Sequence, residues 1–547
     1  MEEEIIKTDV LCVGGGIAGL MAAIRAGELG AKVVVAEKGN TLSSGAGGCG
    51  NDHFECYIPE VHGPDMEIFL KDLLRGQKSE RLYDIERLRA HFAKTFEIVK
   101  LWDSWGIPMR YEGKWEFAGH AFPGHTRCYL KYAGRVQKEA LTRQALDRGV
   151  KIMNRVMVFD LLRDGDKVVG AVGVHTREDK LLVFQAKTVI LGTGGWCARL
   201  YPGPVPNLLF NLNNRPTCTG DGRAMAYRAG VELQNMELPQ RHIGVKYFAR
   251  TGQATWIGIF RDPEGKPIGP FLTGPDRRYH DMMGETNKLF IEQYTKAGKG
   301  PIYMDGAGMS DDDYEYMNYW MRNEGNAALI DHLEAEGIDH RKNPIEFMTY
   351  HIRINGQIRA NGQTETALKG LYAAGDEASG GISEAATSGW TGGENAAKNI
   401  QKMEAPDVER ARANIEETKE LLGQLRVRQN GPVWQEANIA VQQTMGDYAG
   451  SVRYANLLKA GLNHLRRLRE KAYATMMARN QHELGRCLEV LNMFDIGEAI
   501  LVMAEDRKES RALHVRPDYP YTNPLLNKFH TVRKVGNKLV TEWREGN

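Results

Sequence analysis

A glycine-rich segment near the N-terminus constrains the fold of this chain more than any other feature. After an apolar run that ends at Val13, the sequence reads Gly-Gly-Gly-Ile-Ala-Gly, and Glu37 closes a second apolar run about 20 residues further on. Gly14 permits a tight turn, Gly16 lets the backbone approach a pyrophosphate, and Gly19 lets the following helix lie close to the sheet. The Glu37 carboxylate can accept hydrogen bonds from ribose hydroxyls. This order of elements predicts a dinucleotide site in a parallel α/β sheet.

Strand and helix alternate at the start of the chain. We expect a short buried strand over 9–13 and a helix over 17–29, whose N-terminal amides would point at the phosphates. Residues 151–190 return to β structure and lead into a glycine turn, and a second buried strand and glycine turn follow at 370–376. The nucleotide-binding domain is therefore predicted to be discontinuous.

The residues outside that domain differ from it in pattern. Aromatic residues, prolines and acidic runs over 240–349 indicate an inserted domain. From about 405 to 515 the pattern is helical, and we expect the last thirty residues to be irregular.

Length and composition exclude several classes of protein. The chain has 547 residues, and its 71 basic against 70 acidic residues give no sign of a nucleic-acid or anionic-membrane surface. It has no apolar run of about 18 residues, so we expect no membrane span, and its acidic N-terminus lacks an export signal. Seven cysteines without a Cys-x-x-Cys pair argue against disulfides and against an iron–sulfur cluster or zinc site inside the chain. We therefore expect a cytoplasmic protein with no metal site of its own.

Five motifs occur in the order typical of one flavoprotein family. They are Gly14 to Gly19, Gly192-Thr-Gly-Gly195, Thr219-Gly-Asp-Gly222, Gly370-Leu-Tyr-Ala-Ala-Gly-Asp376, and the segment from Arg507-Lys-Glu-Ser-Arg to Pro520. With these motifs the chain resembles the flavoprotein subunits of succinate dehydrogenase and fumarate reductase over nearly its whole length. The resemblance implies bound FAD, a capping domain over the reacting face of the flavin, and a C-terminal helical domain.

The expected fold class is accordingly α/β, with a two-dinucleotide-type, Rossmann-like FAD-binding domain, an inserted α+β capping domain and a C-terminal helical domain. We place the two parts of the FAD-binding domain at 1–240 and 350–404, the capping domain at 241–349, and the helical domain with its tail at 405–547.

Within the family the chain is most similar to adenylylsulfate reductase alpha subunits, in its middle strands and in the cap around 241–256 and 301–305. Three departures bear on function. The loop 42–49 has no histidine where members with covalent flavin carry one, which implies non-covalent FAD. Segment 384–390 lacks the arginine with which fumarate-type enzymes clamp a dicarboxylate, and their proton-donating arginine in the cap is also missing. Lys246 stands where adenylylsulfate reductases use an arginine, which removes a bidentate fork for sulfate or phosphate.

The resemblance also implies a set of FAD contacts. Asp376 would bind ribityl hydroxyls, and Met157 would flank the adenine through its backbone. Ser388 and Gly389, placed ahead of a helix from about residue 392, would aim amides at the flavin N1–O2 side. The full expected set is Gly14, Gly16, Ala18, Gly19, Glu37, Lys38, Ser43, Ser44, Gly47, Gly48, Met157, Thr193, Gly194, Asp221, Gly375, Asp376, Ser388 and Gly389.

The expected catalytic residues are basic. His351 aligns with the substrate-binding histidine of the family, and a donor beside flavin N5 could both stabilise an oxyanion and move protons. Lys246 and Arg241 could neutralise an anionic substrate or be solvated surface residues, and Arg353 could face the cavity or pair with the acidic cap. One residue of the segment His120, His125 and Arg127 is also expected to reach the pocket.

The resulting hypothesis is an adenylylsulfate-reductase-like FAD oxidoreductase subunit that acts on a small anionic substrate. The chain has one dinucleotide fingerprint and no cluster motif, so we expect electrons to pass to or from a separate iron–sulfur, ferredoxin-like subunit in a hetero-oligomer. Two alternatives remain open. One is a fumarate-reductase-like reductase of another enoate or organic acceptor, and the other is a non-catalytic flavin electron-transfer subunit of a larger thiol/disulfide or quinone-linked complex.

Overall fold

The structure, a computed structural model, describes residues 1–75, 82, 84–121, 124–205, 207–212, 215–248, 255–268, 274–280, 294–378, 380–536 and 538–545, without the side chains of residues 242 and 351–353. Within these residues the central sheet has seven strands, in the order β5-β2-β1-β8-β7-β6, with β15 also paired to β8. Their bounds are β1 (Glu2–Val13), β2 (Val33–Glu37), β5 (Lys151–Asn154), β6 (Val156–Asp164), β7 (Lys167–His175), β8 (Lys180–Leu191) and β15 (Leu371–Ala373).

Strand β8 organises this sheet because it has three neighbours. Its whole length pairs in parallel with β1, its first half pairs antiparallel with β7, and its end at 189–191 pairs in parallel with β15. The pairing with β8 extends β1 back to Glu2, opposite Lys180, so the expected start of the strand at residue 9 was wrong. Strands β1 and β15, each followed by a glycine turn, therefore both lie beside the C-terminal half of β8, which itself leads into the glycine turn at 192–195.

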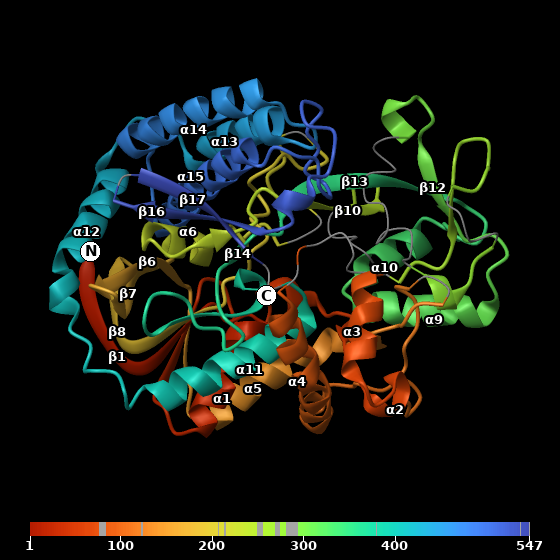
Figure 1. Ribbon diagram of the computed structural model, residues 1–547, viewed down its shortest axis with the longest axis horizontal. Coiled ribbons are helices and arrows are strands. Elements are labelled where there is room, and N and C mark those ends of the chain that lie inside the picture. The colour runs from red at the N-terminus through yellow and green to blue at the C-terminus, as the bar shows by residue number, and fades with distance from the viewer. Residues whose placement is uncertain are drawn as a thin grey trace.

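The two faces of the sheet bury separate cores. Along β1, Val10 and Cys12 belong to one core and Leu11 and Val13 to the other, as the period of two in a strand requires. Helices on the first face are α1 (Ile17–Glu28), α4 (Ile85–Ser104), α5 (Gln137–Asp147) and α11 (Ile382–Asn399). The second face is covered by α6 (Asp221–Arg228) and by the C-terminal helices (Figure 1).

The C-terminal helices are α12 (Arg412–Val427), α13 (Trp434–Ala449), α14 (Ala455–Thr475) and the almost entirely buried α15 (Gln481–Asp506). The expectation of an irregular tail was wrong. Strands β16 (Phe529–Val535) and β17 (Lys538–Arg544) form an antiparallel hairpin that continues through β9 (Leu233–Gln234) to β14 (Gln357–Ile358). The hairpin pairs directly with β9 at residues 233–234, a partner that the sequence of the tail does not show.

A second four-stranded sheet, with helices α9 (Asp311–Asn323) and α10 (Ala327–Ala335), forms the part that we call the cap. Its strand order is β10 (Pro239–Val245), β13 (Ile345–Ile354), β12 (Ile302–Asp305) and β11 (Ile259–Arg261), and it has its own aromatic core around Trp320. The cap lies to one side of the central sheet (Figure 1). Because β10 and β13 pair with each other, the chain enters and leaves the cap at adjacent points.

Four further elements, all short, belong to none of these sheets. Strand β3 (His53–Glu55) pairs with β4 (Tyr129–Lys131), and the helices α2 (Pro59–His62) and α3 (Met66–Arg75) follow β3. Directly after the loop 41–50 the chain contacts the cap, where the Thr255 hydroxyl donates a hydrogen bond to Asp52.

Candidate functional site

A cavity of about 600 Å³ runs along the carboxyl ends of the central strands toward the cap. Ligands of open α/β sheets bind at this edge. Most of the residues expected to contact FAD line this cavity: Gly14, Gly16, Ala18, Glu37, Lys38, Ser44, Gly47, Met157, Thr193, Gly194, Asp221, Gly375, Asp376 and Ser388. Gly19, Ser43, Gly48 and Gly389 lie behind the lining.

The first glycine turn has the close contacts that its sequence predicts. Gly14 has φ +96°, and a Cβ there would lie 2.6 Å from the Gly192 carbonyl oxygen. A Cβ on Gly19 would lie 1.8 Å from the Gly14 carbonyl oxygen, so only glycine lets α1 pack this closely. At Gly16 the nearest atom to a Cβ would be 3.8 Å away, which leaves open space at the N-terminus of α1. This open cradle and the helix amides fit a pyrophosphate.

The Glu37 carboxylate joins two loops at the edge of the cavity. One oxygen accepts a hydrogen bond from the Gly15 amide at 2.6 Å, and the other accepts from the Gly39 amide at 2.5 Å. The side chain is buried and lines the cavity, so its position at the edge of the ligand space is fixed.

Lys38 and Asp221 form a buried ion network with α15. The Lys38 ammonium lies 2.6 Å from Asp221 and 2.8 Å from Glu489, and Asn492 donates a 2.8 Å hydrogen bond to Asp221. Burial alone would lower the pKa of Lys38, but the two carboxylates outweigh it and raise that pKa. Burial would likewise raise the pKa of Glu489, yet Lys38 and neighbouring arginines lower it to about 2. This network ties the end of β2 to the C-terminal helices at the cavity wall.

The glycine turn at residues 192–195 is held by a buried glutamate. Thr193 donates a hydrogen bond to Glu377, which also lies 3.4 Å from the Arg223 guanidinium. Burial raises the pKa of Glu377 to about 7, although Arg223 and Thr193 act in the opposite direction. Asp376 accepts hydrogen bonds from the Trp196 indole at 2.7 Å and from the Gly381 amide at 3.1 Å.

The structure corrects the expected position of Ser388 and Gly389. Helix α11 begins at Ile382, so both residues lie inside the helix and not ahead of it. A Cβ on Gly389 would lie 2.3 Å from the Ala18 carbonyl oxygen, which makes this glycine a contact point between α1 and α11. The Ser388 hydroxyl accepts a 2.8 Å hydrogen bond from the Gly375 amide. The amides at the cavity end of α11 belong to the residues around 381–384 instead.

The loop 41–50 is only partly exposed to the cavity. Ser44 and Gly47 line it, whereas Gly48 packs against the Ser43 backbone, where a Cβ would lie 2.0 Å from the Ser43 carbonyl oxygen. The Arg215 guanidinium reaches the same loop and donates a 2.8 Å hydrogen bond to the Gly45 carbonyl.

Two of the four expected catalytic residues do not reach the cavity. Lys246 forms a 2.6 Å ion pair with Glu346 on the neighbouring cap strand, with 34% of its side chain exposed. Arg241 points to the C-terminal helical part and donates to the Ser451 hydroxyl. The backbone of His351 and Arg353 lies in β13, but their side chains are outside the described part of the chain. The nearby Arg359 pairs with Glu232 at 3.6 Å.

The segment after the loop 41–50 brings polar side chains that sequence reasoning missed. His53 lines the cavity, and its Nδ1 atom lies 2.6 Å from an oxygen of the fully buried Asp52. The Lys131 ammonium lies 2.6 Å from the other Asp52 oxygen. Burial would raise the pKa of Asp52, but Lys131 and His53 outweigh it and hold that pKa well below its usual range. The ring of His120 packs against His53 at an interplanar angle of 50°, with centroids 4.9 Å apart, but His120 does not line the cavity.

The other two members of the expected segment turn away from this group. His125 pairs with Asp72 at 3.1 Å, and Arg127 donates to the Arg278 carbonyl at 3.1 Å. The adjacency of Asn51, Asp52 and His53 to the glycine loop was the available signal for the missed residues.

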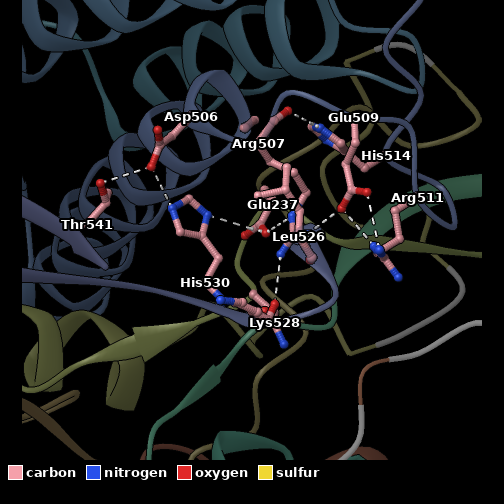
Figure 2. Close-up of polar contacts among 12 residues, drawn as sticks. Glu237, Asp506, Arg507, Glu509, Arg511, His514, Leu526, Lys528, His530 and Thr541 are labelled. Atoms are coloured by element: carbon pink, nitrogen blue, oxygen red, sulfur yellow. Dashed lines mark hydrogen bonds and ion pairs between the residues drawn. The ribbon is translucent and has the colours of Figure 1, made fainter. Parts of the chain in front are cut away.

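The C-terminal Arg-Lys-Glu-Ser-Arg motif supports the junction with the cap (Figure 2). Arg507 is fully buried and contacts Glu237, just before β10, and Glu509, each at 2.6 Å. His530 lies 2.8 Å from Asp506 and 3.5 Å from Glu237. The motif therefore fixes the point where the chain enters the cap, and the neighbouring Ala512 and Phe529 line the cavity.

Two family models match the chain: the FAD binding domain over residues 9–266 and the fumarate reductase flavoprotein C-term over residues 438–541. One subunit of the fumarate reductase (CoM/CoB) from Methanothermobacter marburgensis is 26% identical, over 96% of this chain and 98% of the relative. An L-aspartate oxidase from Streptomyces coelicolor is 25% identical, over 96% of this chain and 91% of the relative.

Solved structures share the fold. Adenylylsulfate reductase from Archaeoglobus fulgidus superposes with a TM-score of 0.84 at 21% identity, over 100% of this chain and 96% of that chain. Quinol fumarate reductase from E. coli superposes with a TM-score of 0.83 at 20% identity, over 100% of this chain and 97% of that chain. Among the described residues, no helix has both the length and the apolar character needed to span a bilayer.

These matches confirm the predicted fold class, in which an α/β FAD-binding domain carries a capping domain and a C-terminal helical domain. The chain belongs to the FAD-dependent oxidoreductase flavoproteins of the fumarate reductase and succinate dehydrogenase family.

Proposed function

We propose that this chain transfers two electrons between FAD and a small anionic substrate, as the flavin subunit of an adenylylsulfate-reductase-like complex. The observation that carries the proposal is the continuity of one cavity, which runs from the pyrophosphate cradle at Gly14 and Gly16 to polar side chains at the junction with the cap. Bound FAD supplies hydride transfer at the flavin ring. Glu37, Asp376 and the glycine turns at 14–19 and 192–195 position it. The loop 41–50 has no histidine for a covalent link.

Two cations among the lining residues support an anionic substrate. The Arg215 guanidinium contacts the loop 41–50, and Arg87 extends from α4 next to the start of α11, where it donates to the Ala378 carbonyl. Helix α11 has no basic residue over 384–390, so in this chain Arg87 would supply the positive charge at that wall. His351, from β13, is the proposed proton donor or acceptor beside the substrate.

The electron partner is proposed to be a separate iron–sulfur subunit. The chain has no Cys-x-x-Cys pair, and similar proteins are named as subunits of larger enzymes. The 26% identity with a fumarate reductase (CoM/CoB) subunit favours a second candidate, fumarate-reductase-like reduction of another enoate.

A reoxidation screen tests these proposals. Purified protein is loaded with FAD, reduced anaerobically with viologen, and mixed with adenylylsulfate, fumarate or other enoates, or disulfides while the flavin absorbance is followed. Reoxidation by adenylylsulfate with release of sulfite supports the leading proposal, and reoxidation by enoates supports the second. No reoxidation by any of these compounds, with FAD still bound, would contradict both and favour the electron-transfer subunit.

A further inference from the structure

A buried cluster in the wall of the cavity has no part in the proposed function. It consists of Glu55 from β3, His91 from α4 and Glu384 from α11, and all three side chains line the cavity. Their exposed fractions are only 7%, 8% and 7%. Three ionisable groups from three separate elements are thus gathered at one place away from bulk water.

The hydrogen bonds of His91 define which ring nitrogen carries the proton. Nδ1 lies 2.8 Å from the Thr387 hydroxyl, and that hydroxyl lies 3.0 Å from the Ser383 carbonyl, to which it donates. A hydroxyl has one proton, so Thr387 accepts its second hydrogen bond from Nδ1–H of His91. In the neutral imidazole the remaining lone pair is then on Nε2.

This Nε2 atom faces the two carboxylates. It is buried and has no hydrogen-bond partner among the described residues, and it lies 3.7 Å from a Glu55 oxygen. One atom each of Glu55, His91 and Glu384 lies within 4.8 Å of the other two. A buried lone pair 3.7 Å from a carboxylate oxygen is unfavourable unless a proton or a metal ion lies between the two atoms.

The spacing fits a metal ion better than a proton. A proton on Nε2 would need an acceptor at about 3 Å, which is shorter than the distance to Glu55. Ligand atoms around a tetrahedral ion, bound at about 2.0–2.2 Å, are separated by roughly 3.4 Å. In metal sites, the ring nitrogen that does not bind the metal donates a hydrogen bond that fixes the orientation of the ring. Thr387 accepts such a bond from Nδ1 of His91.

We propose that Glu55, His91 and Glu384 bind a divalent transition-metal ion in the wall of the cavity. Three protein ligands leave one position open, and because all three side chains line the cavity, that position faces the ligand space. Water or a substrate oxygen completes the coordination. The absence of cysteine pairs led to the expectation of no metal, but this ligand set contains no cysteine and spans residues 55–384.

The test uses tag-free protein with FAD bound, stripped of metal with a chelator, and Zn²⁺ alone as the probe. Calorimetry should show one Zn²⁺ site per chain, and anomalous diffraction from crystals soaked in Zn²⁺ should show a peak between the three side chains. His91→Gln and Glu384→Gln should weaken binding at least tenfold. Thr387→Val, which removes only the partner of Nδ1, should weaken binding about 10–100-fold.

His340→Gln is the matched control. His340 is also buried with no hydrogen-bond partner for Nε2 among the described residues, but its ring stacks on Tyr314 at 5.0 Å. Zn²⁺ affinity should be unchanged in this variant. The proposal is overturned if the wild-type chain binds no Zn²⁺, or if His91→Gln, Glu384→Gln and Thr387→Val all bind it as tightly as the wild type. Bound FAD and circular dichroism verify folding, and Glu55→Gln replaces any cluster variant that fails to fold.

Discussion

The buried pair of Arg507 and Glu237 provides the sharpest test of how the C-terminal motif stabilises the fold. Both side chains are fully buried, and the Arg507 guanidinium lies 2.6 Å from Glu237 and 2.6 Å from Glu509. Removing one partner of a buried ion pair leaves an uncompensated charge and costs about 3–5 kcal/mol. We expect Arg507→Met to lower the free energy of unfolding by this amount.

The pKa of Glu237 gives a second route to the same magnitude. Burial would raise that pKa, but Arg507 and His530 outweigh it and lower it from 4.5 to about 2. The stabilisation is therefore complete above pH 4.5 and is lost as the pH falls toward 2, which corresponds to roughly 3 kcal/mol. Glu237→Gln should remove this part of the acid sensitivity.

Urea denaturation followed by circular dichroism, for the wild type, both single variants and the double variant Arg507→Met/Glu237→Gln, measures the coupling. The double variant should be less destabilised than the sum of the single variants by at least 1 kcal/mol. Arg479→Met is the control, because Arg479 is 62% exposed and solvent screens its ion pair with Glu483. A loss below 1 kcal/mol for Arg507→Met, or additive single variants, would refute the reasoning.

Three further predictions concern the cavity. Gly389→Ala places a Cβ 2.3 Å from the Ala18 carbonyl oxygen, so α1 and α11 must move apart. We expect the free energy of unfolding to fall by about 1–3 kcal/mol and FAD to be retained less well on gel filtration. Full retention of FAD would contradict this contact. Because the pKa of Glu377 is raised from 4.5 to about 7, its ionisation disfavours the folded state. As the pH rises from 4.5 to 7, the free energy of unfolding of the wild type should fall by roughly 3 kcal/mol relative to that of Glu377→Gln. Parallel pH profiles of the two proteins would contradict this. Lys246→Ala removes a partly exposed ion pair and should change turnover less than twofold. His351→Ala should abolish turnover with FAD still bound. A larger loss of turnover for Lys246→Ala than for His351→Ala would restore Lys246 as the catalytic cation.

Several parts of the site could be predicted from local sequence alone. The roles of Gly14, Gly16 and Gly19 depend on backbone geometry within one strand–turn–helix unit, and the contacts at Gly14 and Gly19 agree with that prediction. The glycine turn at residues 192–195 could be predicted because a buried strand followed by a glycine pair has a clear local pattern. Ser388 and Gly389 were misplaced because small residues are compatible with both a loop and a helix-packing face, and only the contact with α1 distinguishes these two.

Side chains whose partners are distant in sequence could not be assigned in the same way. Lys246 was a candidate for the cavity, but pairing of β10 with β13 places Glu346 beside it, and the ion pair forms there. The cluster of Glu55, His91 and Glu384 has no recognisable spacing, because its three elements meet only when α4 and α11 pack together beside β3.

The sequence by itself determined the cofactor class and the fold class, since the glycine turns and the acidic residue after the second strand act within short segments where spacing dictates geometry. Tertiary structure alone decided which charged side chains face the cavity and which pair elsewhere. The physical reason is that a buried charge lies wherever its counter-charge is, and helices and strands far apart along the chain supply that counter-charge.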